Sequence, residues 1–305
     1  MSVTPEAYQE LLNARVFTPE AFATALLGRK RRTPQGVDGK LLLIAADHTS
    51  RGKLSLGGDR LAMSDRHTLL DRISRALASP EVDGVLASAD VLEELAFLGL
   101  LDNKLAIGTM NRGGLIGATW ELDDRVTAYD VDHIESMGLD GGKTLLRIDY
   151  QDPNVARTIE TVAAITTALA DRKLLSMIEP LPYIKDSEGL AILDPSDDAL
   201  TTVVAIASGL GSSSAFTWLK VPASERMAQV AGATSLPVLM LGGDPSLGVD
   251  SIFDRWEKGM KVPNVRGLLA GRTLLYPPDG NVEGATTRAA SIVRPEYSGT
   301  NSRSE

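Results

Sequence analysis

A lysine lies in the middle of an apolar, β-prone run, AFTWLKVP, at residues 215–222. A strand of this composition is normally buried, and buried lysines are rare unless they are paired or put to use. The amine of Lys220 can attack a carbonyl only when it is uncharged, and at an ordinary lysine pKa only about one in 2,500 is uncharged at pH 7. Burial and a neighbouring cation both lower that pKa. The run therefore predicts a reactive amine that forms an imine (a Schiff base) with a carbonyl substrate.

Three further ionisable residues lie at the ends of apolar runs. Asp47 ends LLLIAAD, Glu179 ends KLLSMIE and Lys143 opens KTLLRIDY, in which Arg147 falls on the same face as Lys143. We expect Lys143 to be the second cation near Lys220 and Glu179 to shuttle protons during imine formation. Asp47 would bind substrate hydroxyls or orient one of the lysines. Alternatively, each charged residue only caps its strand or forms an ion pair.

Strand-like and helix-like segments alternate from residue 40 onward, and about eight such units favour a (β/α)8 TIM barrel, an α/β fold. Barrel chemistry lies at the carboxyl ends of the strands, and alternate strand residues point inward. We predict a barrel over 40–290, a short N-terminal helical extension over 1–39, and a polar, disordered tail over 291–305. The expected strands are 41–47, 83–88, 104–109, 143–150, 173–179, 215–221, 237–242 and 266–271.

The strand ends AADHTSRG, KTLLRIDY, MIEP, TWLKVP, LMLGGDP and LLAGRTLL resemble, in this order, those of the lysine-dependent (class I) sugar-phosphate aldolases. The most similar branch contains the tagatose-bisphosphate, sulfofructose-phosphate and archaeal-type fructose-bisphosphate aldolases. The chain is also similar to (β/α)8 proteins encoded in actinobacterial inositol-catabolism clusters. The resemblance covers roughly residues 41–275 and implies an aldehyde-lyase of carbohydrate metabolism.

The resemblance also implies roles for individual residues. Lys220 matches the imine-forming lysine of the sixth strand and Glu179 the acid/base glutamate of the fifth. Lys143 and Asp47 match a lysine and an aspartate on the fourth and first strands. The loops that hold a substrate phosphate correspond to Gly242, Gly243, Gly271 and Arg272.

The phosphate site also has a basis in the residues themselves. TIM barrels commonly bind phosphate with the loops after strands seven and eight. Glycines there let backbone N–H groups approach an anion, and Arg272 can add a bidentate contact. A glycine pair after a strand is equally typical of a plain tight turn. His48 and Arg147 are further candidates for contact with the substrate.

Metal and nucleic-acid functions are disfavoured. The other histidines, His67 and His133, lie in different units from His48, so no zinc site and no cofactor is expected. The net charge of −9 argues against nucleic acid, but a local pocket can still bind a small anion. The chain has no cysteine, no apolar run long enough for a membrane span and no secretory signal, which indicates a cytoplasmic protein. The two N-terminal helices offer a contact surface for a homo-oligomer.

Three functions remain open at this stage. The first is a class I aldolase that cleaves or forms a C–C bond in a phosphorylated ketose or keto acid, in sugar or inositol catabolism. The second is a transaldolase or isomerase on the same barrel that uses Lys220 only for its charge. The third is a non-catalytic protein that binds phosphosugars.

Overall fold

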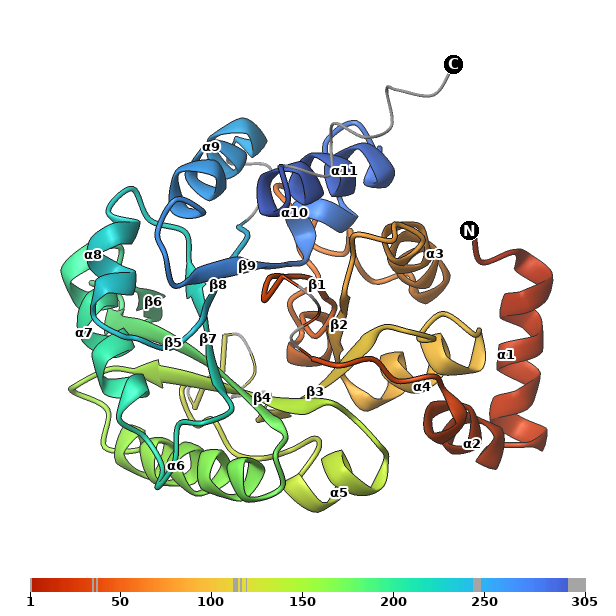
Figure 1. The fold of residues 1–305 in the computed structure, drawn as a ribbon, viewed down its shortest axis with the longest axis horizontal. Coiled ribbons are helices and arrows are strands. Elements are labelled where there is room, and N and C mark those ends of the chain that lie inside the picture. The colour runs from red at the N-terminus through yellow and green to blue at the C-terminus, as the bar shows by residue number, and fades with distance from the viewer. Residues whose placement is uncertain are drawn as a thin grey trace.

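A computed structural model describes residues 2–34, 36, 38–111, 115, 117–118, 120–243 and 248–295. Its centre is a closed ring of parallel strands, surrounded by helices (Figure 1). Neighbouring strands run in the order β4-β3-β2-β1-β9-β8-β7-β5, and pairing of β4 with β5 closes the ring into a (β/α)8 TIM barrel. The barrel strands are β1 (Leu41–Ala45), β2 (Gly84–Ala87), β3 (Leu105–Asn111), β4 (Gly141–Ile148), β5 (Leu175–Lys185), β7 (Thr217–Pro222), β8 (Val238–Leu241) and β9 (Val265–Ala270).

Each of the eight expected strand segments overlaps one of these barrel strands, and the predicted fold class is confirmed. The strands are buried on both faces, and their residues separate into two layers by parity. Leu43, Ile107 and Leu239 belong to the inner cluster, whereas Ile44 and Met110, which have the opposite parity in their strands, pack with the helices. Strands of a closed barrel need apolar residues on both faces, which explains the nearly continuous apolar runs.

Helices cover the outside of the barrel and connect successive strands (Figure 1). Several begin at a side-chain cap, as the N-cap carboxylates of Asp65 and Asp130 and the hydroxyl of Ser196 illustrate. The helices of the barrel are η1 (Thr49–Arg51), α3 (Arg66–Leu77), α4 (Ala89–Phe97), α5 (Val131–Ser136), α6 (Val155–Asp171), α7 (Asp197–Ser208), α8 (Met227–Gly232), α9 (Val249–Gly259), α10 (Arg272–Leu275) and α11 (Val282–Val293).

Two helices precede the barrel, α1 (Pro5–Phe17) and α2 (Glu20–Gly28). They lie beside α3 and α4 on one flank of the ring (Figure 1). Phe22 stacks on Phe97 of α4 with ring centroids 4.8 Å apart. Leu11 and Leu26 are buried in the same apolar cluster as the barrel helices. The helical extension therefore shares the core of the barrel.

The structure differs from the expected segments in two places. β5 continues past Glu179 and forms an antiparallel hairpin with a short strand, β6 (Ala191–Leu193). At the C-terminus α11 continues to Val293, which places 291–293 in a helix, where a disordered tail was expected. Residues 296–305 of that predicted tail lie outside the described residues, as do positions 112–114, 116 and 119 of the segment after β3.

In the part of the chain that the structure describes, none of the helices has the length and apolar character needed to cross a membrane.

Candidate active site

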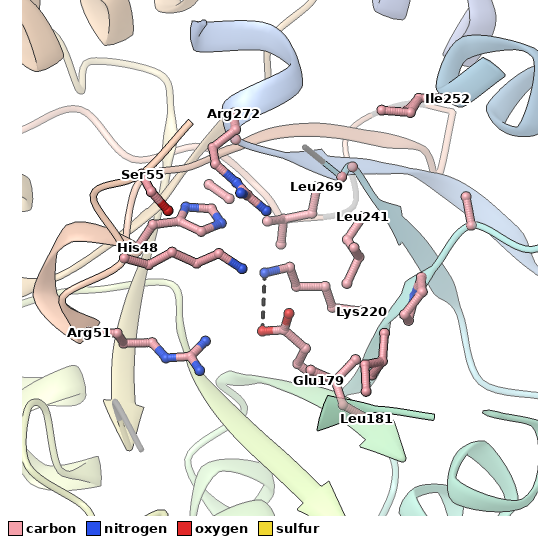
Figure 2. Close-up of a pocket in the computed structure, with 18 of the residues that line it drawn as sticks. His48, Arg51, Ser55, Glu179, Leu181, Lys220, Leu241, Ile252, Leu269 and Arg272 are labelled. Carbon is pink, nitrogen blue, oxygen red and sulfur yellow. Dashed lines mark ion pairs between the residues drawn. The ribbon is translucent and has the colours of Figure 1, made fainter. Parts of the chain in front are cut away.

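A cavity of about 540 Å³ opens at the carboxyl ends of the barrel strands. Lys220 and Glu179 rise into its centre from β7 and β5 (Figure 2). His48 and Arg51, from the segment after β1, and Arg272, after β9, surround the Lys220 amine (Figure 2). Parallel strands bring their carboxyl ends to one edge, so these residues meet although they are far apart in the sequence.

Four buried ionisable side chains form a continuous chain of ion pairs at the base of the cavity. The Lys220 ammonium nitrogen Nζ lies 3.1 Å from Oε2 of Glu179. Lys143 Nζ lies 2.5 Å from the same oxygen and 3.2 Å from Oδ2 of Asp47, to which it donates a hydrogen bond. Lys143 is 1% exposed and Asp47 3%, and neither lines the cavity. The structure thus brings together all four residues predicted to carry the chemistry.

Burial and neighbouring charges shift the pKa values of the two lysines in opposite directions. Burial lowers the pKa of Lys220, and the positive charge of Lys143 lowers it further, against the attraction of Glu179. Burial acts on Lys143 in the same direction, but Asp47 and Glu179 outweigh it, so the pKa of Lys143 is raised. Lys220 is therefore the amine that loses its proton more readily, while the two carboxylates beside Lys143 favour its charged form.

Both carboxylates stay ionised despite their burial. Burial by itself favours the neutral acid, but Lys143 and Lys220 together lower the pKa of Glu179 to about 2. The same two lysines hold the pKa of Asp47 well below its usual range. At neutral pH, Glu179 can therefore accept a proton from a group bound at Lys220.

His48 lies in the cavity beside the Lys220 amine (Figure 2). Burial lowers the pKa of His48 to about 3, and Lys220, Arg272 and Lys53 contribute to that shift against the attraction of Asp47. The imidazole is neutral at physiological pH and has one donor and one acceptor nitrogen. It can therefore hydrogen-bond a substrate without adding charge to the site.

The glycines predicted to bind phosphate line the cavity, yet two of them are also required by packing. A Cβ atom at Gly271 would lie 2.4 Å from the carbonyl oxygen of Ala45 and 2.7 Å from the ring of His48. At Gly242 a Cβ atom would lie 2.5 Å from Oγ1 of Thr273. Gly243 has room for a side chain, because the closest atom to its Cβ position is Cδ1 of Ile252 at 3.6 Å. These glycines hold the β8 and β9 loops close together beside Arg272.

Arg147 points inward from β4, as predicted, but it does not line the cavity. Its side chain is completely buried and forms ion pairs with Asp124 at 2.6 Å and Glu121 at 3.2 Å. The guanidinium is thus occupied by the segment after β3. This location does not favour the direct contact with substrate that we expected from the sequence.

Several residues of the cavity were not predicted. Arg51 lies in the segment AADHTSRG after β1, and Lys53 follows that segment directly. Their closeness to a strand end could have indicated that they line the cavity. Glu121 and the hairpin residues had no periodic or spacing signal. These further lining residues include Arg51, Lys53, Ser55, Glu121, Leu181, Tyr183, Leu193, Ala223, Ile252 and Arg255.

Among the described residues, no group of three or more histidine and acidic side chains is arranged to hold a metal ion. The polar side chains of the cavity are instead mostly cationic and face an amine and a carboxylate. Such an arrangement can bind a small anion and carry out carbonyl chemistry.

Comparison with known families and structures adds to this geometry. The Cgl0159-like family matches residues 39–290. The crystal structure of Cgl0159 from Corynebacterium glutamicum is 43% identical, covers 96% of this chain and 98% of that one, and superposes with a TM-score of 0.92. None of the curated proteins matches the sequence.

Two solved structures of archaeal aldolase share the barrel at low identity. A fructose 1,6-bisphosphate aldolase is 17% identical, with 89% of this chain and 98% of that chain covered and a TM-score of 0.63. A second such structure, in which the catalytic lysine is covalently bound to the carbinolamine intermediate of the substrate, is 15% identical over 89% and 99%, with a TM-score of 0.62. At this identity the likeness shows a common fold.

Proposed function

The chain belongs to the Cgl0159-like family, and we propose that it is a class I aldolase that acts on a phosphorylated ketose or keto acid. One observation carries the proposal. Lys220 is buried at the base of a cavity, its pKa is lowered, and an ionised carboxylate lies 3.1 Å from its amine. These are the properties of an imine-forming lysine with an acid/base partner.

In the first step, the uncharged amine of Lys220 adds to the carbonyl carbon of the substrate. The proton released from the nitrogen passes to Glu179, the closest carboxylate. Glu179 returns that proton to the oxygen, which gives the neutral carbinolamine. A second proton, taken up from solvent through Glu179, then protonates the hydroxyl group, which leaves as water, and the iminium forms. Lys143 stabilises Glu179 as the ionised base before and after each transfer.

In the second step, the iminium accepts the electron pair of the breaking C–C bond. A base removes the proton from the hydroxyl two carbons from the imine carbon, an aldehyde leaves, and an enamine remains on Lys220. Protonation of the enamine and hydrolysis of the imine release the second product. Synthesis follows the same steps in reverse.

The substrate's phosphate is placed by the loops after β8 and β9. Arg272 and the glycines 242, 243 and 271 line that side of the cavity, and Arg272 reaches toward the Lys220 amine (Figure 2). Phosphate on a carbon close to the carbonyl would then lie beside Arg272 while the carbonyl meets Lys220. This barrel is shared with the archaeal aldolase whose catalytic lysine is covalently bound to the carbinolamine intermediate, and that likeness supports an imine mechanism.

Reductive trapping tests the proposal. Dihydroxyacetone phosphate and other phosphorylated ketones are incubated with the protein and sodium borohydride, and modified peptides are mapped by mass spectrometry. We expect an adduct on Lys220, equal to the substrate less water plus two hydrogens. Lys220→Met should abolish the adduct and lower turnover by several orders of magnitude, since loss of a nucleophile costs up to about 10⁶-fold.

Two lysines serve as controls. Lys104 also has a pKa lowered, to about 8, but it is bonded to the carbonyl oxygens of Ser79 and Val82, away from the cavity, and should stay unmodified. Lys258→Met, on the exposed face of α9, should trap like the original protein. Absence of an adduct with every phosphorylated ketone would contradict the proposed function.

A further inference from the structure

Arg147 is one of the largest completely buried side chains of the protein, and its partners come from outside its own strand. Its Nε and Nη2 donate to the two carboxylate oxygens of Asp124, at 3.1 Å and 2.6 Å. The guanidinium carbon also lies 5.4 Å from the ring centroid of Tyr183 in the extended part of β5. One buried cation thus connects two elements that project beyond the barrel.

Arg147 also holds Glu121. Its Nη1 donates to Oε1 of Glu121 at 3.2 Å, and its Nη2 donates to the backbone carbonyl of the same residue. The second carboxylate oxygen of Glu121 accepts from the backbone N–H of Gly117 at 2.9 Å. A carboxylate oxygen has two acceptor positions, so each oxygen of Glu121 can accept one further hydrogen bond.

Glu121 depends on Arg147 for its position, whereas the residues that follow Glu121 have other hydrogen bonds to β3. The backbone N–H groups of Thr127 and Ala128 both donate to the carbonyl of Met110 in β3, at 3.2 Å and 3.0 Å. The amide of Asn111 donates to the carbonyl of Asp124 at 3.3 Å. Upstream of Asp124, the backbone hydrogen bonds of the described residues in this segment are local turns, such as that from the N–H of Glu121 to the carbonyl of Ala118. Without Arg147, Glu121 would lose both of its bonds to the barrel.

Glu121 lines the cavity on the side that faces away from the proposed phosphate loops. In the circular strand order, β3 and β4 lie directly across the barrel from β8 and β9. A substrate with its phosphate near Arg272 and its carbonyl at Lys220 therefore extends its other end toward Glu121. Among the described residues that line the cavity, Glu121 and Glu179 are the acidic ones, and Glu179 is engaged by two lysines.

We propose that Glu121 determines specificity by accepting hydrogen bonds from hydroxyl groups at the end of the substrate that is remote from its phosphate. Arg147 is the positioning residue that sets the place of Glu121. The substrate class is accordingly a phosphorylated compound that is hydroxylated at its far end. This inference rests on the proposed function only for the orientation of the substrate.

Two open-chain probes test the inference without imine chemistry. Glucitol 6-phosphate and hexyl phosphate share a phosphate and a six-carbon chain, and neither has a carbonyl. By calorimetry, the original protein should bind glucitol 6-phosphate about tenfold or more tightly than hexyl phosphate, as hydrogen bonds to an ionised group imply. Glu121→Ala should reduce that ratio several-fold and should not weaken the binding of inorganic phosphate. Glu188→Ala, in the exposed turn of the hairpin, is the matched control and should preserve the ratio.

A double-mutant cycle separates positioning from folding. Arg147→Met should lower the ratio as Glu121→Ala does, and it should have no further effect when Glu121→Ala is already present. Because burial raises the pKa of Asp124 even with Arg147 beside it, Arg147→Met together with Asp124→Asn avoids leaving a buried charge and supplies a foldable variant. Arg147→Lys should restore part of the ratio.

The outcomes distinguish this inference from the proposed function. Equal binding of the two probes, no binding of either, an unchanged ratio in Glu121→Ala, or an additional loss from Arg147→Met in the absence of Glu121 would each overturn it. Trapping on Lys220 with no preference between the probes rejects this inference alone. A clear preference without any trapping rejects the aldolase proposal alone.

Discussion

At the scale of single residues, the site is controlled by an asymmetry between two buried lysines. Lys143 has carboxylate oxygens at 2.5 Å and 3.2 Å, whereas Lys220 has one at 3.1 Å, which it shares with Lys143. When Lys220 loses its proton, one ammonium remains between two carboxylates. The number of carboxylates around each lysine thus decides which of the two amines becomes the nucleophile.

Lys143→Met should raise the pKa of Lys220, because Lys143 now lowers that pKa and Lys220 would become the single ammonium beside Glu179 and Asp47. A smaller fraction of Lys220 would be uncharged at pH 7. We expect the rate of borohydride trapping with dihydroxyacetone phosphate to fall about tenfold or more at pH 7 and to recover as the pH rises. The measurement is the trapping rate as a function of pH. Lys143→Arg, which keeps the charge, is the control, and an unshifted pH profile in Lys143→Met would contradict the assignment.

The sequence indicated which residues of the strands converge, because parity and position at a strand end are local properties. Lys220, Glu179, Lys143 and Asp47 were found in this way, and the structure brings them together. The same parity correctly predicted that Arg147 points inward. It could not reveal that Asp124 and Glu121 form ion pairs with the Arg147 guanidinium. Those partners come from an irregular segment, for which no periodicity predicts where a side chain lies.

At the scale of elements, β5 continues to Lys185, whereas the sequence predicted that this strand ends at residue 179. Pro180 and Pro182 follow Glu179 and are typical of a strand end, since proline cannot donate to a sheet. The backbone N–H of Ser176 donates toward β7, so positions 180 and 182 face that same side. The pairing of β5 with β7 ends at Ile178, and no donor is needed beyond it. The prolines are therefore compatible with a strand that leaves the barrel and becomes a hairpin at the cavity wall.

Two ion pairs attach the N-terminal part of the chain to the barrel. The segment after α2 is attached to the turn between α5 and β4 through Asp140, whose side chain is fully buried. Arg29 and Arg31 donate to different oxygens of that carboxylate, at 2.8 Å and 3.0 Å. The Arg29 side chain is 2% exposed, whereas that of Arg31 is 51% exposed. These two arginines thus bind the same carboxylate and differ in their exposure to solvent.

Arg29→Met should cost about 3 kcal/mol of unfolding free energy, because it removes the buried partner of a buried charge. Arg31→Met should cost less than about 1 kcal/mol, because its ion pair is half exposed and is screened by solvent. Urea unfolding followed by circular dichroism measures both values. Equal losses in the two variants would show that burial does not distinguish the two ion pairs.

At the scale of the whole molecule, the charge of the cavity opposes that of the protein. The chain carries a net charge of −9, yet among the described residues that line the cavity, cations outnumber acidic side chains. Apart from the Lys220 amine, the cations are Arg51, Lys53, Arg255 and Arg272, and the acids are Glu121 and Glu179. A concave site of one sign attracts ligands of the other sign even when the surrounding surface repels them. The arrangement favours small anions and disfavours large polyanions, which would also meet the acidic exterior.

This contrast predicts a strong dependence of binding on salt. Raising NaCl from 0.1 M to 1 M shortens the screening length from about 10 Å to about 3 Å, so the attraction of the cavity for an anion weakens. Calorimetry should show the affinity for glucitol 6-phosphate falling several-fold over this range, while uncharged glucitol shows no such change. Arg272→Gln should bind glucitol 6-phosphate more weakly and with a shallower dependence on salt, because it removes one of the cations of the phosphate side. An affinity for glucitol 6-phosphate that is the same at both salt concentrations would mean that the cationic lining does not hold the phosphate.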